Sequence, residues 1–326
     1  MSKLSILLTG RRSAAPAIAV AFAMFSLSTA RAFAATDWSA IQTAMHADGV
    51  VMPGDVLRFE LVRQDLSMTV DGTAVPSFQV AAVSNGFVAF KPMANGHFYA
   101  DGSLPTLESE MADMVPVLLT HPHIRITSIE NRIINESPRL VWVHFEGTGT
   151  GTQLSGWIAA ALAKIHDPQV GVTVIPGVNS IINPSQILPP KVLALFNEGF
   201  VEQLTDIFAF YLPRPNEQSI MLGNHVKAES GLGVGQSFYI QVPFSGGSDI
   251  TLNIDFALRV EDLSEVQNLL RNGGFTITGQ SNNFVDESRR LYFLHATASG
   301  DGFALGQVLL NIIDVIQANQ AALGNR

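Results

Sequence analysis

The sequence predicts an α+β protein of two similar tandem domains, each a mainly antiparallel sheet with helices packed on one face. Three observations lead to this fold class. The 326-residue chain repeats itself with a period of 151, each copy follows the order strand–helix–strand–strand–helix, and 47% of its residues are apolar. A repeat of that length can hold its own core, and this order of elements is typical of a sheet backed by helices. We therefore expect a β-α-β-β-α core in each copy.

The repeat is clearest in the C-terminal half of each copy. A shift of 151 places residues 107–154 on residues 258–305 without a gap, and 16 of these 48 positions are identical. The identical pairs include Glu110/Glu261, Leu118/Leu269, Ile126/Ile277, Asn131/Asn282, Glu136/Glu287, Arg139/Arg290, Leu140/Leu291, His144/His295 and Gly151/Gly302. Further upstream the same shift pairs Arg63 with Arg214 and Phe87 with Phe238. A constant shift over so many residues indicates a duplicated domain.

Residues 1–34 have the three parts of a secretory signal peptide. Lys3, Arg11 and Arg12 make a positive start, residues 14–27 are apolar, and residues 32–34 (Ala-Phe-Ala) fit the small-x-small cleavage rule. The apolar stretch is too short to cross a bilayer as a helix. Either the general or the twin-arginine export route fits. We predict cleavage after residue 34, a periplasmic or secreted bacterial protein, and no transmembrane segment in the mature chain.

The mature chain is expected to divide at a proline-rich linker. Residues 35–166 form the first predicted repeat, residues 191–326 form the second, and residues 167–190 between them contain five prolines. Proline fixes φ and donates no amide hydrogen, so this segment is expected to be extended. Its apolar residues Ile187 and Leu188, with Ile181 and Ile182, predict that it lies against a domain surface.

Each copy is expected to contain the same elements in the same order, judged by apolar periodicity and turn residues. In the first copy we expect a helix at 38–47, strands at 56–61, 87–91 and 98–100, a helix at 107–120, strands at 124–134 and 139–145, and a helix at 154–165. In the second copy we expect a helix at 192–197, strands at 207–212, 238–242 and 250–256, and helices at 260–271 and 303–318. The glycine-rich residues 147–151 are expected to form a tight turn rather than an anion cradle, because no lysine follows them.

Several motifs resemble the LppY/LpqO-like family of exported bacterial proteins, a tandem domain of unknown function. They are Phe90-Lys91-Pro92-Met93, the run from Glu136 to His144, and Asp286-Glu287-Ser288 with Arg290, Leu291 and His295 in the second copy. The resemblance implies an exported tandem domain with no assignable activity. It also implies histidines at residues 130 and 132, where this chain has Glu130 and Arg132. If the family's histidines bind a metal, this chain has lost most of that set.

His144 and His295 are the first candidates for a binding site. They lie at equivalent strand ends, and a neutral imidazole can ligate a metal or move protons near pH 6.5. A metal site centred on His97, His144 and Glu146, with Glu130 as another possible carboxylate, would form if the folded sheet brings them together. A strand histidine bonded to backbone is the simpler interpretation, because only one ligand is evident in each copy.

Two pairs of arginines recur in the copies and are candidate ligand-binding residues. They are Arg63 with Arg214 and Arg139 with Arg290. A guanidinium group suits a carboxylate or phosphate ligand. We favour structural ion pairs with Glu60, Glu136 or Glu287, since ion pairs beside turns are common.

Composition excludes several classes of function. With 19 basic against 28 acidic residues and no basic block, the chain lacks the charge pattern of a nucleic-acid binder. The absence of cysteine excludes disulfides, thiol catalysis, cysteine-bound zinc and a lipoprotein anchor. The motifs G-x-S-x-G, H-E-x-x-H and S-x-x-K are also absent.

The favoured hypothesis is therefore a non-enzymatic exported protein that binds a small ligand or a cell-envelope component. Clefts between domains are common places for such sites. No cofactor is expected, and a bound metal ion is kept as an alternative. One alternative is a metal-dependent enzyme or metal-binding protein with a His/carboxylate site near His144. The other is a degenerate structural member of the family.

Overall fold

The computed structural model describes the chain in segments that begin at residue 36. They are residues 36–63, 65–75, 84–93, 96–171, 187–197, 200–204, 207–214, 218–221, 224–227, 230–241, 248–285, 287 and 289–324. The predicted signal peptide and residues 172–186 of the predicted linker lie outside the described residues. The domain boundaries at 166 and 191 therefore stay predictions.

The first repeat forms a sheet in the order β1-β2-β5-β6-β9-β7, with all neighbouring strands antiparallel. Its strands are β1 (Val50–Met52), β2 (Val56–Val62), β5 (Gly86–Pro92), β6 (His97–Leu107), β7 (Ile124–Glu130) and β9 (Leu140–Thr150), with β10 (Gln169–Val170) also paired to β2. Its helices are α1 (Ser39–Met45), α3 (Glu108–Leu119) and α4 (Gly151–Leu162). A small sheet of β3 (Thr69–Val70), β4 (Thr73–Ala74) and β8 (Glu136–Ser137) stands apart.

The second repeat forms a sheet with the equivalent order, β11-β12-β15-β16-β18-β17. Its strands are β11 (Phe200–Leu204), β12 (Ile207–Pro213), β15 (Gly235–Gln241), β16 (Asp249–Leu258), β17 (Thr276–Ser281) and β18 (Tyr292–Asp301). Its helices are α5 (Pro190–Asn197), α6 (Val260–Asn272) and α7 (Gly302–Gly324), with a hairpin of β13 (Gln218–Met221) and β14 (Asn224–Lys227) and a short 3₁₀ helix at Ser230–Leu232. The equal strand order confirms two tandem α+β repeats.

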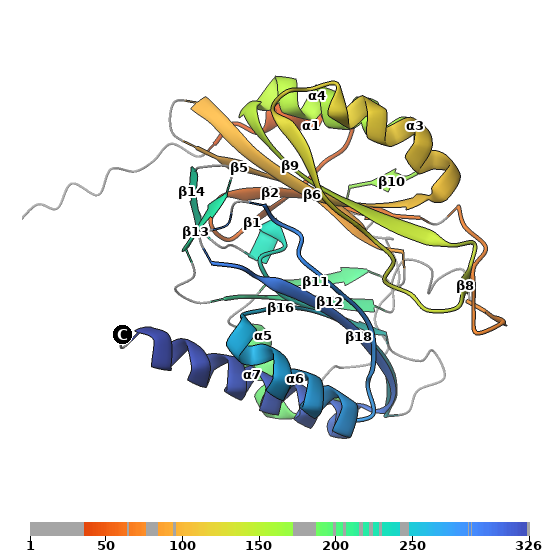
Figure 1. Cartoon of the computed structure of the whole chain (residues 1–326), viewed down its shortest axis with the longest axis vertical. Coiled ribbons are helices and arrows are strands. Elements are labelled where there is room, and N and C mark those ends of the chain that lie inside the picture. Colours follow the sequence, from red (N-terminus) through yellow and green to blue (C-terminus); the bar gives the residue numbers. More distant parts are fainter. Residues whose placement is uncertain are drawn as a thin grey trace, which may run out of the picture. The chain divides into compact units, whose positions relative to one another are not determined.

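The helices of each repeat cover one face of its sheet, and the two uncovered faces lie against each other (Figure 1). Each sheet buries an apolar core beneath its own helices. A third buried cluster lies between the sheets and draws residues from both, including Met52 and Tyr99 from the first and Tyr211 and Phe293 from the second. The two sheets thus share a core as well as holding separate ones.

The shift that relates structurally equivalent residues of the two repeats is not 151 everywhere. Glu110 and Asp262 each accept a hydrogen bond, 2.8 Å long, from the backbone N–H of the residue that precedes their helix, Leu107 and Arg259. These two carboxylates are therefore structural equivalents, and they are 152 residues apart. The expected pair Glu110/Glu261 is wrong, because a one-residue difference moves a side chain to another face. After the helices the 151-residue shift returns, since Asn131 and Asn282 make equivalent hydrogen bonds.

The sequence predicted a tight turn at the glycine-rich residues 147–151, and this prediction is wrong. They continue β9 and begin α4. A Cβ atom on Gly147 would lie 3.0 Å from Ile124 and 3.3 Å from Leu154, and one on Gly149 would lie 3.3 Å from Leu154. Because these glycines have no side chain, α4 can pack directly on β9.

The described ends of the predicted linker lie against the two repeats. Gly171 donates its backbone N–H to the backbone carbonyl of Glu60 at 3.0 Å, next to β10. Ile187 and Leu188 are buried in the core of the second repeat. This confirms the contact expected for these two apolar residues, while Ile181 and Ile182 lie outside the described residues. Within the described chain, no helix combines the length and apolar character that a membrane crossing requires.

Candidate functional site

Two adjoining cavities lie between the facing sheets. The first cavity has a volume of about 40 Å³, and the second has a volume of about 110 Å³. Both are lined by Asn85, Arg132, Tyr239, Asp255 and His295, so the two cavities share lining residues from both repeats. The inter-sheet space is therefore the candidate site.

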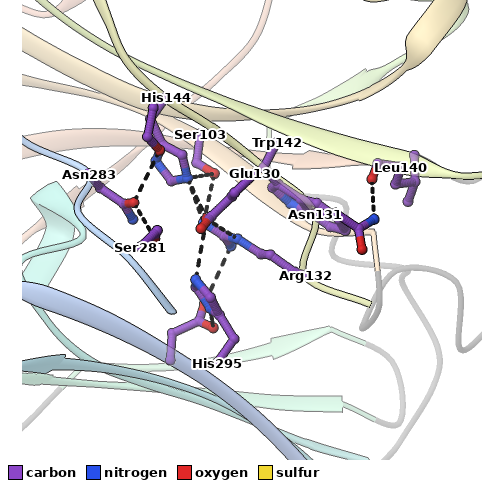
Figure 2. A network of polar contacts seen from close by, with 12 residues as sticks. Ser103, Glu130, Asn131, Arg132, Leu140, Trp142, His144, Ser281, Asn283 and His295 are labelled. Atoms are coloured by element: carbon purple, nitrogen blue, oxygen red, sulfur yellow. Dashed lines mark hydrogen bonds and ion pairs between the residues drawn. The ribbon is translucent and has the colours of Figure 1, made fainter. Parts of the chain in front are cut away.

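The two repeat-related histidines meet at this place. His144 points from β9 and His295 from β18 toward Glu130, at the end of β7 (Figure 2). The Glu130 Oε1 atom lies 2.9 Å from His144 Nε2 and 3.2 Å from His295 Nε2. Both imidazoles are almost completely buried. One histidine from each repeat thus approaches the Glu130 carboxylate, His144 through a hydrogen bond and His295 at an ion-pair distance.

Arg132 provides the positive charge beside that carboxylate. Its Nε donates to Glu130 Oε1 at 2.8 Å, and its Nη1 lies 3.5 Å from Asp255 Oδ2. Its Nη2 lies 2.9 Å from His144 Nε2 and donates to Ser103 Oγ at 3.1 Å (Figure 2). The guanidinium therefore occupies the position between the carboxylates and the imidazole where a bound cation would sit.

Asp255 orients the second histidine. Its Oδ1 forms a short hydrogen bond with His295 Nδ1, so the opposite nitrogen of that ring faces Glu130. A carboxylate on one ring nitrogen fixes the orientation of an imidazole and favours its protonated form. His295 accordingly lies between two carboxylates.

The surroundings move the pKa values of the two histidines in opposite directions. Burial lowers the pKa of His144 to about 4, and the hydrogen bond to Glu130 offsets this only in part. Burial also opposes the charge on His295, but Asp255 and Glu130 outweigh it and raise that pKa. Burial would raise the pKa of Glu130, yet Arg132 and both histidines hold it well below its ordinary value. Near neutral pH, His144 is neutral while Glu130 is ionised.

A second charged residue, Arg58, also lines the first cavity. Arg58 forms a short ion pair with Glu60, and its Nη1 donates to the Gly231 carbonyl at 3.0 Å. The guanidinium lies 3.9 Å from the ring centre of Phe87 and 4.9 Å from that of Tyr211. The Tyr211 hydroxyl donates to Glu60 at 3.0 Å, so this group also joins the repeats.

The sequence analysis considered Glu130 beside His144 but missed four other site residues, Arg58, Glu60, Arg132 and Asp255. One signal was present in β2, where residues 57, 59 and 61 are apolar and residues 58 and 60 are charged. That alternation puts both charges on the sheet face away from the helices. No comparable signal marks Asp255, because its role comes from a contact with the other repeat.

Arg63 and Arg214 lie outside both cavities. Arg63 donates to Asp65 at 2.8 Å and to Glu110 at 2.7 and 2.9 Å, and it also reaches the Pro105 carbonyl at 3.2 Å. This saturated guanidinium fixes the start of α3. The favoured interpretation as a structural ion pair fits, but the partners are not Glu60, Glu136 or Glu287.

The equivalent arginine of the second repeat does the same for α6. Arg214 Nη1 donates to Asp262 at 3.1 Å and to the Ala257 carbonyl at 2.7 Å. The remaining pair, Arg139 and Arg290, is exposed and lines neither cavity. Arg290 lies 3.5 Å from Glu287, a partner that the sequence analysis named.

The structure does not bring the suggested metal ligands together. His97 is exposed and lies opposite Thr150, six residues along β9 from His144, a separation of roughly 20 Å at 3.4 Å per residue. Glu146 is buried on β9 at two residues from His144, on the same sheet face. Among the residues that the structure describes, no group of three histidine or acidic side chains is arranged to hold a metal ion.

Comparison with known proteins places the chain in a family without assigning an activity. A family model described as Domain of Unknown Function (DUF1259) matches residues 39–164 and again residues 194–315. No curated protein matches the chain. A solved structure, EtuB from Clostridium kluyveri, aligns with 85% of this chain and 93% of its own chain at 9% identity. Its TM-score of 0.21 is too low to indicate a shared fold. The chain belongs to the DUF1259 family and contains its domain twice.

Proposed function

We propose that this protein binds a small ligand, without catalysis, in the two cavities between its sheets. The observation that carries the proposal is the convergence of His144 and His295, one from each repeat, on Glu130 beside those cavities. Neither repeat alone contains the whole site, so the duplication itself supports a role for the interface.

The energetics of the interface favour a binding role over a purely structural one. Glu130, Arg132 and both histidines are largely removed from water, and the Asp255 side chain is 27% exposed. Burying such a network is commonly no better for stability than apolar packing of the same volume. A buried polar group beside a cavity with aromatic walls is, in contrast, typical of a ligand site. If the protein were only a degenerate structural member of its family, there would be no reason to keep both the buried polar network and the cavities beside it.

The metal-dependent alternative has less support. Its three suggested ligands are separated, and Arg132 already places a positive charge within 3 Å of Glu130 and His144. A divalent cation would have to displace that guanidinium.

Export remains part of the proposal, as does placement among the LppY/LpqO-like members. The signal-like residues 1–34 and the motifs at residues 90–93 and 136–144 support these two points. Fractionation of cells that express the full chain should recover a product beginning at residue 35 outside the cytoplasm. Recovery of the intact chain in the cytoplasm would contradict export.

Ligand binding is tested on the protein as purified from its native compartment. Native mass spectrometry should show a small molecule bound one to one, and extraction should identify it. His295→Gln removes an imidazole from the cavity wall and should abolish the bound mass, whereas the exposed control Arg139→Gln should retain it. A protein without bound mass, which no small-molecule panel stabilises against heat, would contradict the proposal.

A further inference from the structure

We propose that Asp101 is the residue by which the first cavity recognises a hydroxyl group, and that the ligand is a short uncharged polyol. This inference rests on the proposed function and names its ligand class. It begins with a carboxyl group that the protein itself leaves incompletely bonded.

Asp101 lies on β6, on the sheet face that meets the second repeat, directly opposite Glu146 on β9. It is 2% exposed and lines the first cavity. Its Oδ1 atom has no hydrogen-bond partner among the described residues. A buried polar atom without a partner is destabilising, so a native protein that retains one commonly satisfies it with a bound molecule.

The basic side chains that line the cavities each have an acidic partner. Arg58 has Glu60 as its partner, and Arg132 has Glu130. His295 has Asp255. A negatively charged ligand would therefore enter a buried site in which the described lining residues offer no unpaired positive charge, and the cost of removing its charge from water would not be repaid. An uncharged ligand avoids this cost.

The state of the Asp101 carboxyl favours a hydroxyl as its partner. Burial raises the pKa of Asp101 well above its ordinary value, and Glu146 adds to this while Arg58 opposes it. A neutral carboxyl can donate or accept, depending on which oxygen carries the proton. A hydroxyl also does both, so it can satisfy Oδ1 in either case.

The dimensions and walls of the cavities define the rest of the ligand. A water molecule occupies about 30 Å³ of liquid, so the first cavity has room for about one polar group and the second for about three or four. The rings of Phe87, Phe145 and Phe293 supply apolar wall to the first cavity, against which carbon-bound hydrogens can pack. A chain of three or four hydroxylated carbons that passes Arg132 and His295 matches this space.

The test compares erythritol with its carboxylate erythronate by calorimetric titration of the mature protein. Wild type should bind erythritol at least about tenfold more tightly than erythronate. Asp101→Asn keeps a neutral donor and acceptor and should bind erythritol within about threefold of wild type, whereas Asp101→Leu should lose about tenfold or more. The exposed Asp249→Asn is the matched control and should behave as wild type.

Each result decides the matter. Tighter binding of erythronate, or equal binding of erythritol by wild type and Asp101→Leu, overturns the inference. If Asp101→Leu does not fold, the comparison of the two ligands on wild type decides alone. A charged molecule that copurifies and is lost in His295→Gln would overturn the polyol class while leaving the proposed function intact. Absence of any bound molecule, with no binding of either probe, would remove both.

Discussion

Glu130 is the residue on which the inter-sheet network depends, because Arg132, His144 and His295 all contact its carboxylate. Glu130→Gln keeps the shape but removes the charge, so the more distant Asp255 becomes the remaining carboxylate beside the buried Arg132 guanidinium. We expect the free energy of unfolding to fall by about 3 kcal/mol, the lower part of the range for breaking a buried ion pair. Urea unfolding measures this. Arg139→Gln, at an exposed position, should change it by less than about 0.5 kcal/mol.

The two histidines predict a pH dependence with opposite signs. The pKa of His144 falls from 6.5 to about 4 on folding, so between these values the unfolded chain binds the proton and the folded chain does not. Stability from this group is complete above pH 6.5 and is lost as the pH falls toward 4, by roughly 3 kcal/mol in total. His144→Gln should flatten the urea-derived stability curve in this window. An unchanged slope would contradict the assignment.

For His295 the sign is reversed. Because Asp255 and Glu130 raise its pKa above 6.5, the folded chain binds the proton more tightly. This contribution is complete below pH 6.5 and is lost as the pH rises through the folded value. His295→Gln should therefore change the alkaline side of the same curve, and a change confined to the acid side would show that the roles of the two rings are exchanged.

The position of Arg132 predicts that the site binds a metal cation once this side chain is removed. Arg132→Ala removes the guanidinium and leaves space beside the Glu130 carboxylate and the imidazoles of His144 and His295. We expect the variant to bind Zn²⁺ at least about tenfold more tightly than wild type, since carboxylate and imidazole are suitable ligands. Competition with a chromophoric chelator measures the affinity, and Arg132→Ala/Glu130→Gln should reverse the gain. Equal affinity in wild type and Arg132→Ala would contradict this role of the guanidinium.

At the scale of elements, two glycines near α4 predict opposite effects of the same substitution. A Cβ on Gly147 would meet Ile124 and the His123 carbonyl at 3.0 and 3.1 Å, whereas a Cβ on Gly156, inside α4, meets nothing within 4 Å. Gly147→Ala should destabilise the protein by about 1–3 kcal/mol through overpacking. Gly156→Ala should stabilise it by about 0.5–1 kcal/mol through helix propensity. Thermal unfolding of both variants checks the two signs.

The order of elements could be predicted from the sequence, while their exact correspondence could not. Apolar periodicity gave the bounds of some elements closely, for example α3 at 108–119 against the expected 107–120. It gave others poorly, because β6 continues to residue 107 beyond the expected 98–100 and α7 continues to residue 324 beyond the expected 318. The short strands β3, β4 and β13 escaped because two to four residues carry no readable period. The one-residue offset at Glu110 and Asp262 escaped because identity favours Glu261, and only the hydrogen bond to the helix start distinguishes the two.

At the scale of the whole molecule, the core shared between the sheets predicts that the repeats unfold together. All three tryptophans, Trp38, Trp142 and Trp157, belong to the first repeat. Leu270→Ala removes a buried side chain from the core of the second repeat and should cost about 2–5 kcal/mol. We expect the urea midpoint of tryptophan fluorescence to fall together with that of circular dichroism.

The control for this prediction is Ser264→Ala, at an exposed position of the same helix. It should leave both midpoints unchanged. A fluorescence midpoint that does not respond to Leu270→Ala would show that the repeats unfold independently, and it would weaken the argument that the inter-sheet contacts define one site.

The sequence by itself determined the duplication, the order of elements and the positions of His144 and His295, because periodicity and repetition are properties of neighbouring residues and of fixed shifts. Only the tertiary structure decided that the two sheets face each other. Strand periodicity tells which residues share a face, but it does not tell which face meets which. Arg132 and Asp255 are 123 positions apart in the sequence and lie in contact only because both uncovered faces bury apolar side chains against each other.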